Sequence, residues 1–225
     1  MHRDPARQEA LQALADEACR RLDARGDAAN DGAHVQRVWR NARVVGLYAS
    51  RDEGLTIDGD VLKVAVFTHD LGRGLEQDGE HHTYASARIA EELLRAQGLD
   101  DMVWPVGKVV LEHSASLGRT PSCPESWILR DAERLDALGA LGIARCMITG
   151  GLRSTPCLYD PADPLARKRD LDDERYLLDH FRTHLFGLAE QMHTAYGRKE
   201  GLRRARVLRA FYDALLKEAG FGPEG

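Results

Sequence analysis

Apolar residues recur at steps of three and four positions along most of this 225-residue chain, the spacing of one face of an α-helix. A first series stops at Gly26, and a second begins after Asp31, whose side chain can cap a helix. No segment shows the convincing apolar–polar alternation of a half-buried strand. The periodicity therefore predicts an all-α fold. The apolar positions of the two series are Leu11, Leu14, Ala15, Ala18 and Leu22, then Val35, Val38, Trp39, Ala42 and Val45.

The same pattern predicts helices further along the chain, and a polar stretch with three prolines over about 153–172 predicts an exposed excursion. We predict a single domain over 1–225, with its core at about 30–215. The expected helices are about 58–70 ended by Gly72, 84–97 ended by Gly98, one from Val103 to the Glu112-His113 pair, one from about Glu125 through Ile143, and renewed helical patterning from Tyr176 to Leu216.

Composition narrows the function classes. The chain is 43% hydrophobic and 30% charged, as in a soluble globular protein. Its net charge of -5 argues against a protein that mainly binds the nucleic-acid backbone. Its four cysteines lack Cys-x-x-Cys spacing, and neither a signal peptide nor a run of ~20 apolar residues is present. We therefore expect a cytoplasmic protein with reduced thiols, no membrane association and no stable nucleic-acid partner.

Four side chains of metal-binding types lie between residues 34 and 131: His34, the adjacent pair His69-Asp70, and Asp131. The pair ends the apolar run 61–68, where ionisable groups are costly unless a cation compensates them. Two imidazoles and two carboxylates suit Mn, Fe, Co, Ni or Zn better than Ca. Together these donors predict a divalent-metal site.

Each donor taken singly also has a structural explanation. His34 can cap its helix or lie on the surface, and the His69-Asp70 pair can serve as a helix-end hydrogen bond. Asp131 can pair with Arg134, one helical turn away. The order of the four donors is what favours a shared ion.

That order resembles the HD-domain superfamily of metal-dependent phosphohydrolases, in particular a branch of small bacterial members similar to nucleotide pyrophosphohydrolases. The resemblance implies an all-helical HD-domain bundle in which His34, His69, Asp70 and Asp131 bind one divalent metal (Mn, Co, Ni, Fe, Mg or Zn). It also implies hydrolysis of nucleoside or deoxynucleoside triphosphates, or of related phosphoesters, by a metal-activated water. The stretches that carry it are 33–39, 68–72, 112–114, 131–140 and 194–199.

The proton-transfer group is left open, because many HD domains carry a Glu shortly after the His-Asp pair. Here Arg73 and Gly74 follow, and Glu76 is the nearest Glu. Beside Asp70, the catalytic candidates are Glu112 and His113. The candidates for substrate binding are Arg37, Lys63, Arg73, His82 and Arg134.

Two other functions stay open: a di-iron HD-type oxygenase using His81 or His82 with His113, and a non-catalytic nucleotide- or metal-sensing HD module.

His180 and His184 have the i,i+4 spacing that can bind zinc. Without the adjacent Glu of a metalloprotease, we expect them to be solvated or packed helix residues. The expected partner is a small phosphorylated substrate, a nucleotide in the first instance, and a homodimer is left open.

Overall fold

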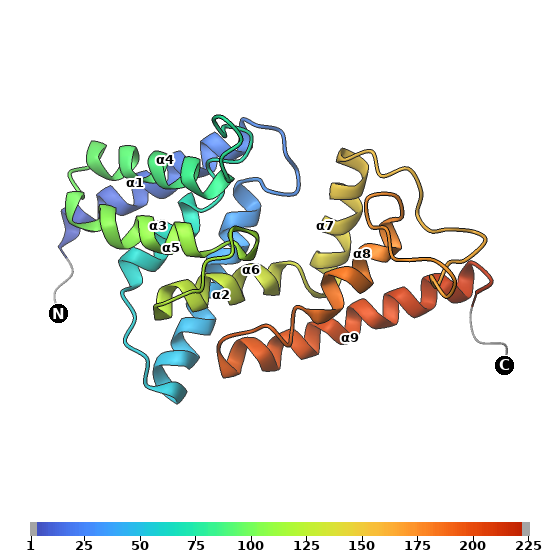
Figure 1. The fold of residues 1–225 in the computed structure, drawn as a ribbon. Coiled ribbons are helices and arrows are strands. Elements are labelled where there is room, and N and C mark those ends of the chain that lie inside the picture. Colours follow the sequence, from blue (N-terminus) through green and yellow to red (C-terminus); the bar gives the residue numbers. More distant parts are fainter. Residues whose placement is uncertain (1–3, 222–225) are drawn as a thin grey trace. The chain divides into compact units, whose positions relative to one another are not determined.

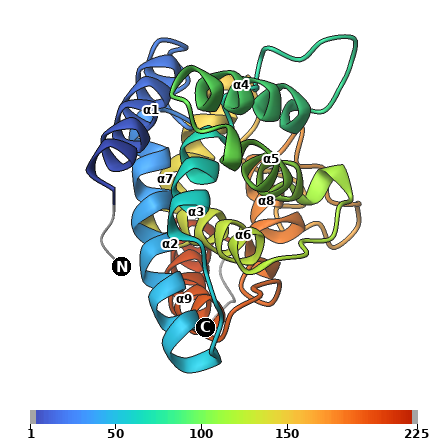
Figure 2. The same ribbon diagram turned by 90° about the vertical axis from the view of Figure 1, so that its left-hand side faces the viewer.

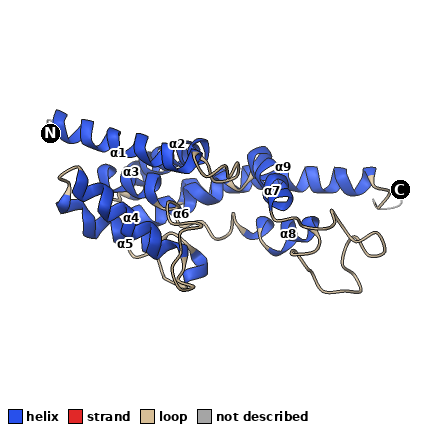
Figure 3. Ribbon diagram, turned by 90° about the horizontal axis from the view of Figure 1, so that it is seen from above, coloured by secondary structure: helices blue, strands red, loops and turns tan. Residues whose placement is uncertain are grey.

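The computed structural model describes residues 4–221, and within them every regular element is a helix (Figure 3) apart from one isolated bridge between Cys157 and Tyr176. The predicted all-α class is confirmed. Contacts divide the chain into two compact units, Met1–Glu133 and Arg134–Gly225, which are described separately below. The single-domain extent over 1–225 stays a prediction.

The first unit is arranged around α3, a short and strongly apolar helix at its centre (Figures 1 and 2). Contacts join α3 to α1, α2, α4 and α5. Its sequence is apolar nearly all round, which is the pattern of a helix buried on every side. The helices of this unit are α1 (Pro5–Asp23), α2 (Gly32–Glu53), α3 (Gly59–Thr68), α4 (His82–Ala96), α5 (Val103–Glu112) and most of α6 (Pro124–Asp136), with short 3-10 turns η1 (Asp100–Met102) and η2 (Ala115–Leu117).

Aspartates fix where the first three helices begin. The side chain of Asp4 accepts a hydrogen bond from Ala6 N, and that of Asp31 accepts one from His34 N at 2.8 Å. Asp58 accepts from the first turn of α3 in the same way. Each carboxylate satisfies amide groups that have no partner inside the helix and lies at its positive end. The predicted cap at Asp31 is confirmed, and it sets the start of the helix that carries His34.

Helix α3 ends at Thr68, and the turn that follows packs tightly against α4. A Cβ atom at Gly72 would lie 2.2 Å from Ser86 N and 2.5 Å from His82 O, both backbone atoms. The amide of Gly72 also donates to Ser86 Oγ at 2.8 Å. Gly72 is therefore required for the close approach of the turn to α4, and only a residue without a side chain fits there.

The second unit contains α7 (Gly139–Leu152), α8 (Leu177–Thr183), η3 (Leu185–Gly187) and α9 (Ala195–Glu218). Helix α7 packs against α8 and α9, and Phe181 stacks near Phe211 and Tyr212 of α9. Between α7 and α8 the chain is almost free of regular structure, and no residue of 153–172 is buried. Among the described helices none alone is long and apolar enough to cross a bilayer; only α6 and α7 taken together would reach that length and apolarity.

The continuous helix expected from Glu125 through Ile143 was wrong: the chain forms two helices with a break between Asp136 and Gly139. Gly139 has a φ of +72°, a conformation that glycine adopts without strain. A Cβ at Gly142 would lie 2.2 Å from the carbonyl oxygen of Ala137. The two glycines therefore allow a sharp turn, which apolar periodicity alone does not reveal.

Candidate metal centre

Four side chains from three segments of the first unit converge on one point. They are His34 of α2, His69 and Asp70 after α3, and Glu133 of α6, and one donor atom from each lies within 4.8 Å of the others. The first three are at most 1% exposed. The sequence-predicted donors His34, His69 and Asp70 are thus brought together across 37 positions of the chain.

Hydrogen bonds to the backbone hold two imidazoles in defined orientations. His69 Nδ1 lies 2.7 Å from Val66 O, and His113 Nδ1 lies 2.6 Å from Val110 O. In each case the Nδ1 hydrogen is donated to a carbonyl three residues earlier, so Nε2 is directed away from its own helix. This is the arrangement by which metal-binding histidines are usually fixed in one tautomer.

A second group of donors shares Asp70 with the first. The Oδ1 atom of Asp70 lies 3.7 Å from His82 Nε2 and 3.6 Å from His113 Nε2, and the two imidazole nitrogens are 3.4 Å apart. All three residues are buried. Asp70 is therefore the centre of both groups, with one oxygen toward each.

Two of these polar atoms are buried without a hydrogen bond. Within the described part of the chain, His69 Nε2 and Asp70 Oδ1 have no hydrogen-bond partner. Leaving such atoms unsatisfied costs free energy, and a cation bound between them would remove that cost. The nitrogen and oxygen donors present therefore fit a divalent transition metal.

The charges around His69 lead to the same conclusion. Burial lowers the pKa of His69, but the carboxylates of Asp70 and Glu133 outweigh it and raise that pKa to about 9. Burial raises the pKa of Asp70, but the positive charges of His69 and Arg73 hold it well below its usual range. Without a metal, a proton on His69 thus provides the positive charge between two carboxylates.

This proton makes metal binding depend on pH. With a pKa of about 9, His69 is protonated at pH 7 and must lose its proton before Nε2 can bind a metal. We expect the apparent metal affinity to fall roughly tenfold for each pH unit below that pKa. Calorimetric titration in buffers of different ionisation enthalpy should detect about one proton released per ion at pH 7. An affinity that does not change between pH 6 and 8 would contradict this prediction.

Arg25, which the sequence did not single out, supports the turn that carries the donors. Its guanidinium donates to the carbonyl oxygen of Asp70 at 2.9 Å and also to that of Leu71. Arg25 lies just after α1, before the Gly26 stop. It therefore holds the backbone of the His69–Leu71 segment from a different part of the chain. No local sequence signal indicates this role, since the contact spans 45 positions.

The sequence and the structure indicate different residues as the fourth donor. Asp131 is 0% exposed on α6, but among the described residues the four-donor group contains Glu133 in its place. Glu133 Oε1 lies 3.5 Å from His69 Nε2, and the Glu133 side chain is 25% exposed. Burial raises the pKa of Glu133, but the nearby positive charge of His69 lowers it to about 2. Sequence reasoning missed Glu133, although it lies in the same stretch as Asp131.

The other predicted catalytic residues have distinct surroundings. Glu112 accepts hydrogen bonds from Ser122 N at 2.9 Å, Ser122 Oγ at 2.7 Å and Ser126 Oγ at 2.6 Å, so its carboxylate ties the end of α5 to the start of α6. His113 belongs to the second donor group. Glu76, the nearest Glu after the His-Asp pair, is exposed. The catalytic role of Glu112 stays a prediction.

Among the predicted substrate-binding residues, Arg73 and His82 lie at the donor groups. Arg73 Nε is 2.7 Å from Asp70 Oδ2, with a side chain that is 40% exposed. Burial and the charge of Arg73 lower the pKa of His82 to about 4, so its imidazole is neutral. Lys63 donates to Gln12 of α1 at 2.9 Å, Arg134 donates to Gln191 O at 2.6 Å, and Arg37 is half-buried on α2.

The fold and the buried donors define an all-α protein with side chains arranged to hold a metal ion. Residues 32–138 match the HD domain model, so this part of the chain is an HD domain. The matched range contains both donor groups, from His34 to Glu133. The predicted family and the general enzyme class are thereby confirmed.

Solved structures extend the similarity to nearly the whole chain. An HD-superfamily hydrolase from Bacillus thuringiensis is 25% identical with a TM-score of 0.67, covering 94% of this chain and 97% of the other. A predicted HD-superfamily hydrolase from an uncultured Thermotogales bacterium is 27% identical with a TM-score of 0.58, covering 94% and 91%. Bacillus subtilis YpgQ in complex with ADP shares the fold at 22% identity and a TM-score of 0.70, covering 95% and 96%. No curated protein matches the chain by sequence.

Proposed function

We propose that this protein hydrolyses nucleoside or deoxynucleoside triphosphates, or related phosphoesters, with one divalent ion held by His34, His69, Asp70 and Asp131. The observation that carries the proposal is the buried convergence of His34, His69 and Asp70, in which His69 Nε2 and Asp70 Oδ1 are buried and accept or donate no hydrogen bond within the described residues. The family supplies the reaction class. The order of the donors and the complete burial of Asp131 support it as the fourth ligand.

A divalent ion in such a site polarises a phosphoryl oxygen and lowers the pKa of a bound water. The side chains around the ion would bind the phosphate and transfer protons. Arg73, half-exposed beside Asp70, can turn from that carboxylate to the phosphate and stabilise its charge. His113 and the neutral imidazole of His82 can hydrogen-bond a phosphate oxygen or water on the other side of Asp70. Glu133 is the only member of the four-donor group with an appreciably exposed side chain, so among these four it is best placed to accept a proton from solvent or substrate.

A nucleotide substrate is supported by fold, because YpgQ, which has this fold, was crystallised with ADP. Manganese is our first choice of ion, since it accepts both imidazole and carboxylate ligands. A cytoplasmic location is supported by four free cysteines. A homodimer stays a prediction, which light scattering of the purified chain would test.

The decisive test is product identification. The chain, freed of metal and then given Mn²⁺, Co²⁺ or Mg²⁺, would be incubated with nucleoside mono-, di- and triphosphates and the products identified by mass. We expect phosphate or pyrophosphate release that requires the ion. Nucleotide binding without any product, under all three ions, would contradict the proposal and favour a sensing module.

A pair of isosteric variants separates the roles of the two carboxylates on α6. We expect Asp131→Asn to lose most of the bound metal, because it removes a charged ligand. Glu133→Gln should keep the metal but lower turnover roughly 100-fold, the usual contribution of a proton-transfer group. Elemental analysis and single-turnover rates on both proteins check this. The opposite pattern, with metal lost only from Glu133→Gln, would assign Glu133 as the fourth ligand.

One observation favours a second candidate, the di-iron oxygenase. Asp70, His82 and His113 form a second donor group beside the first, as two ions sharing one carboxylate would require. Iron stoichiometry decides between the two functions. Two irons per chain with oxygen consumption would favour the oxygenase, whereas one exchangeable ion with phosphate release would favour the phosphohydrolase.

A further inference from the structure

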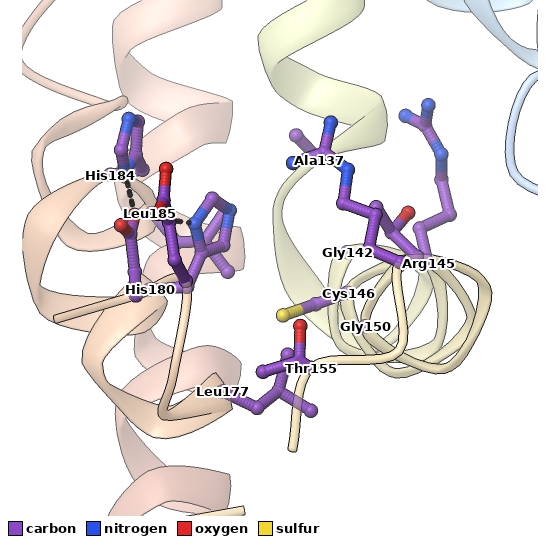
Figure 4. Close-up of a pocket in the computed structure, with 14 residues that line it drawn as sticks. Ala137, Gly142, Arg145, Cys146, Gly150, Thr155, Leu177, His180, His184 and Leu185 are labelled. Atoms are coloured by element: carbon purple, nitrogen blue, oxygen red, sulfur yellow. Dashed lines mark hydrogen bonds and ion pairs between the residues drawn. The ribbon is translucent and has the colours of Figure 1, made fainter. Parts of the chain in front are cut away.

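A third group of metal-binding side chains lies in the second unit, far along the chain from the HD donors. Asp173, His180 and His184 each place one donor atom within 4.8 Å of the others. His180 belongs to α8, and His184 is the residue after its last turn. Their rings stack with centroids 4.7 Å apart, so the two imidazoles lie side by side. Figure 4 shows them on one wall of a cavity, joined by dashed lines through a carboxylate between them.

The distances within this cluster are those of ligands around one ion. Asp173 Oδ2 lies 3.2 Å from His180 Nδ1 and 3.0 Å from His184 Nδ1. Two ligands bound to the same transition metal at about 2.0–2.2 Å, at tetrahedral or right angles, are roughly 2.8–3.6 Å apart. The two carboxylate–imidazole distances are thus compatible with a shared cation, and the three donor atoms all lie within 4.8 Å of one another.

The carboxylate oxygen is also crowded. Besides the two imidazoles, the hydroxyl of Thr183 donates to Asp173 Oδ2 at 2.9 Å. Three groups thus lie close to one oxygen, and His184 Nδ1 also lies 2.8 Å from Thr183 Oγ1, which can accept its hydrogen when no ion is bound. With a cation in place, the imidazole nitrogens would bind the ion as acceptors. The Thr183 hydrogen bond would then orient the ligating carboxylate, as outer hydrogen bonds commonly do at metal sites.

The cluster lines a cavity of about 610 Å³ whose opposite wall is α7 (Figure 4). Glu174 adds a second carboxylate to the lining, while Arg145 of α7 is ion-paired with Asp136 at 3.1 Å. Three protein ligands leave at least one coordination position for water or an anion. Arg153 also lines the cavity and would favour an anion there.

We propose that Asp173, His180 and His184 form a second metal site, separate from the HD centre, that takes a transition-metal dication. Two imidazoles with one carboxylate favour nitrogen-seeking ions over Mg²⁺ or Ca²⁺. Zn²⁺ is the ion of choice among the redox-inert ones, because it accepts four-coordinate sites built from three protein ligands. From the sequence we expect His180 and His184 to be solvated or packed helix residues. The position of Asp173 between them is what favours a role as metal ligands.

The test is metal binding by the full chain without an affinity tag. Asp70→Asn weakens the HD centre, and in this background Zn²⁺ would be titrated by calorimetry and Co²⁺ by its visible absorption. We expect one ion to remain bound. Adding His184→Ala or Asp173→Asn should lower its affinity at least about a hundredfold, since each removes a ligand. His184 has a side chain that is 61% exposed, so its removal leaves packing intact.

Glu174→Gln is the matched control, because it removes one carboxylate from the same cavity without touching the donor set. It should bind Zn²⁺ within a fewfold of the Asp70→Asn parent, and circular dichroism verifies that all variants remain helical. Equal Zn²⁺ affinity in the His184→Ala, Asp173→Asn and Glu174→Gln proteins would overturn the proposal. So would an Asp70→Asn protein that binds no ion. Because the readout is metal binding in the second unit, the result does not depend on which substrate the HD centre uses.

Discussion

Replacing Asp70 by asparagine is expected to lower metal-dependent phosphate release about a thousandfold, which corresponds to roughly 4 kcal/mol of transition-state stabilisation. One oxygen of Asp70 faces His82 and His113, and the other faces His69 and Arg73. Asparagine keeps the shape but removes the charge that both donor groups share. Metal content by elemental analysis should fall together with turnover.

Asp60→Asn provides the control for this variant. Asp60 lies in the first turn of the same helix α3, where its partly exposed side chain pairs with Arg7 at 3.7 Å. The change in charge is identical, but it lies at the opposite end of the helix from the donors. Activity and metal content should remain near those of the unchanged protein. Comparable losses in both variants would indicate a general effect of charge on α3 and would contradict a specific role of Asp70.

Replacing Gly72 by alanine is expected to destabilise the protein by about 3 kcal/mol, at the upper end of the range for overpacking. The added methyl group would lie 2.2 Å from Ser86 N and 2.7 Å from Ala85 C. These are backbone atoms, so no change of rotamer relieves the clash and α4 must move. His82 is at the start of α4, so the second donor group would move with it. Urea unfolding measures the loss of stability.

Gly107→Ala is the matched substitution on a neighbouring helix. A Cβ at Gly107 in α5 meets nothing within 4 Å. Alanine there should stabilise the protein by about 0.5–1 kcal/mol, because it restricts the unfolded chain more than glycine does. If both glycine variants unfold at the same urea concentration, the tight contact between the turn and α4 has no energetic importance.

The features that the sequence predicted correctly depend on residues that lie close together in the chain. The apolar run before His69 determines both the helix α3 and its burial, so the position of the His69-Asp70 pair follows from one segment. The cap at Asp31 likewise places His34 by a local hydrogen bond. Such features require only residues a few positions apart.

What the sequence did not predict depends on contacts between distant segments. The role of Arg25 requires the end of α1 to meet the turn after α3. The approach of Glu133 to His69 depends on how α6 packs, and periodicity does not specify that. The break before Gly139 arises from backbone conformation, not from any loss of apolar pattern.

The His180–His184 pair shows how a third residue changes the interpretation of a motif. Alone, the pair fits a solvated helix face. Asp173 precedes them by seven and eleven positions and lies outside α8, so it is brought to the pair by the loop between α7 and α8. The loop conformation, which has few sequence signals, therefore decides whether the histidines have a common partner.

The central position of α3 links the HD centre to the melting behaviour of the whole first unit. The donors of the HD centre come from α2, from the end of α3 and from α6, so they separate when the first unit unfolds. An ion that binds only the folded chain at a free concentration c raises the free energy of unfolding by RT ln(1 + c/Kd), so the melting temperature rises with the concentration and affinity of the ion. A thermal-shift series over different cations would thus rank the preferred metal before any substrate is known.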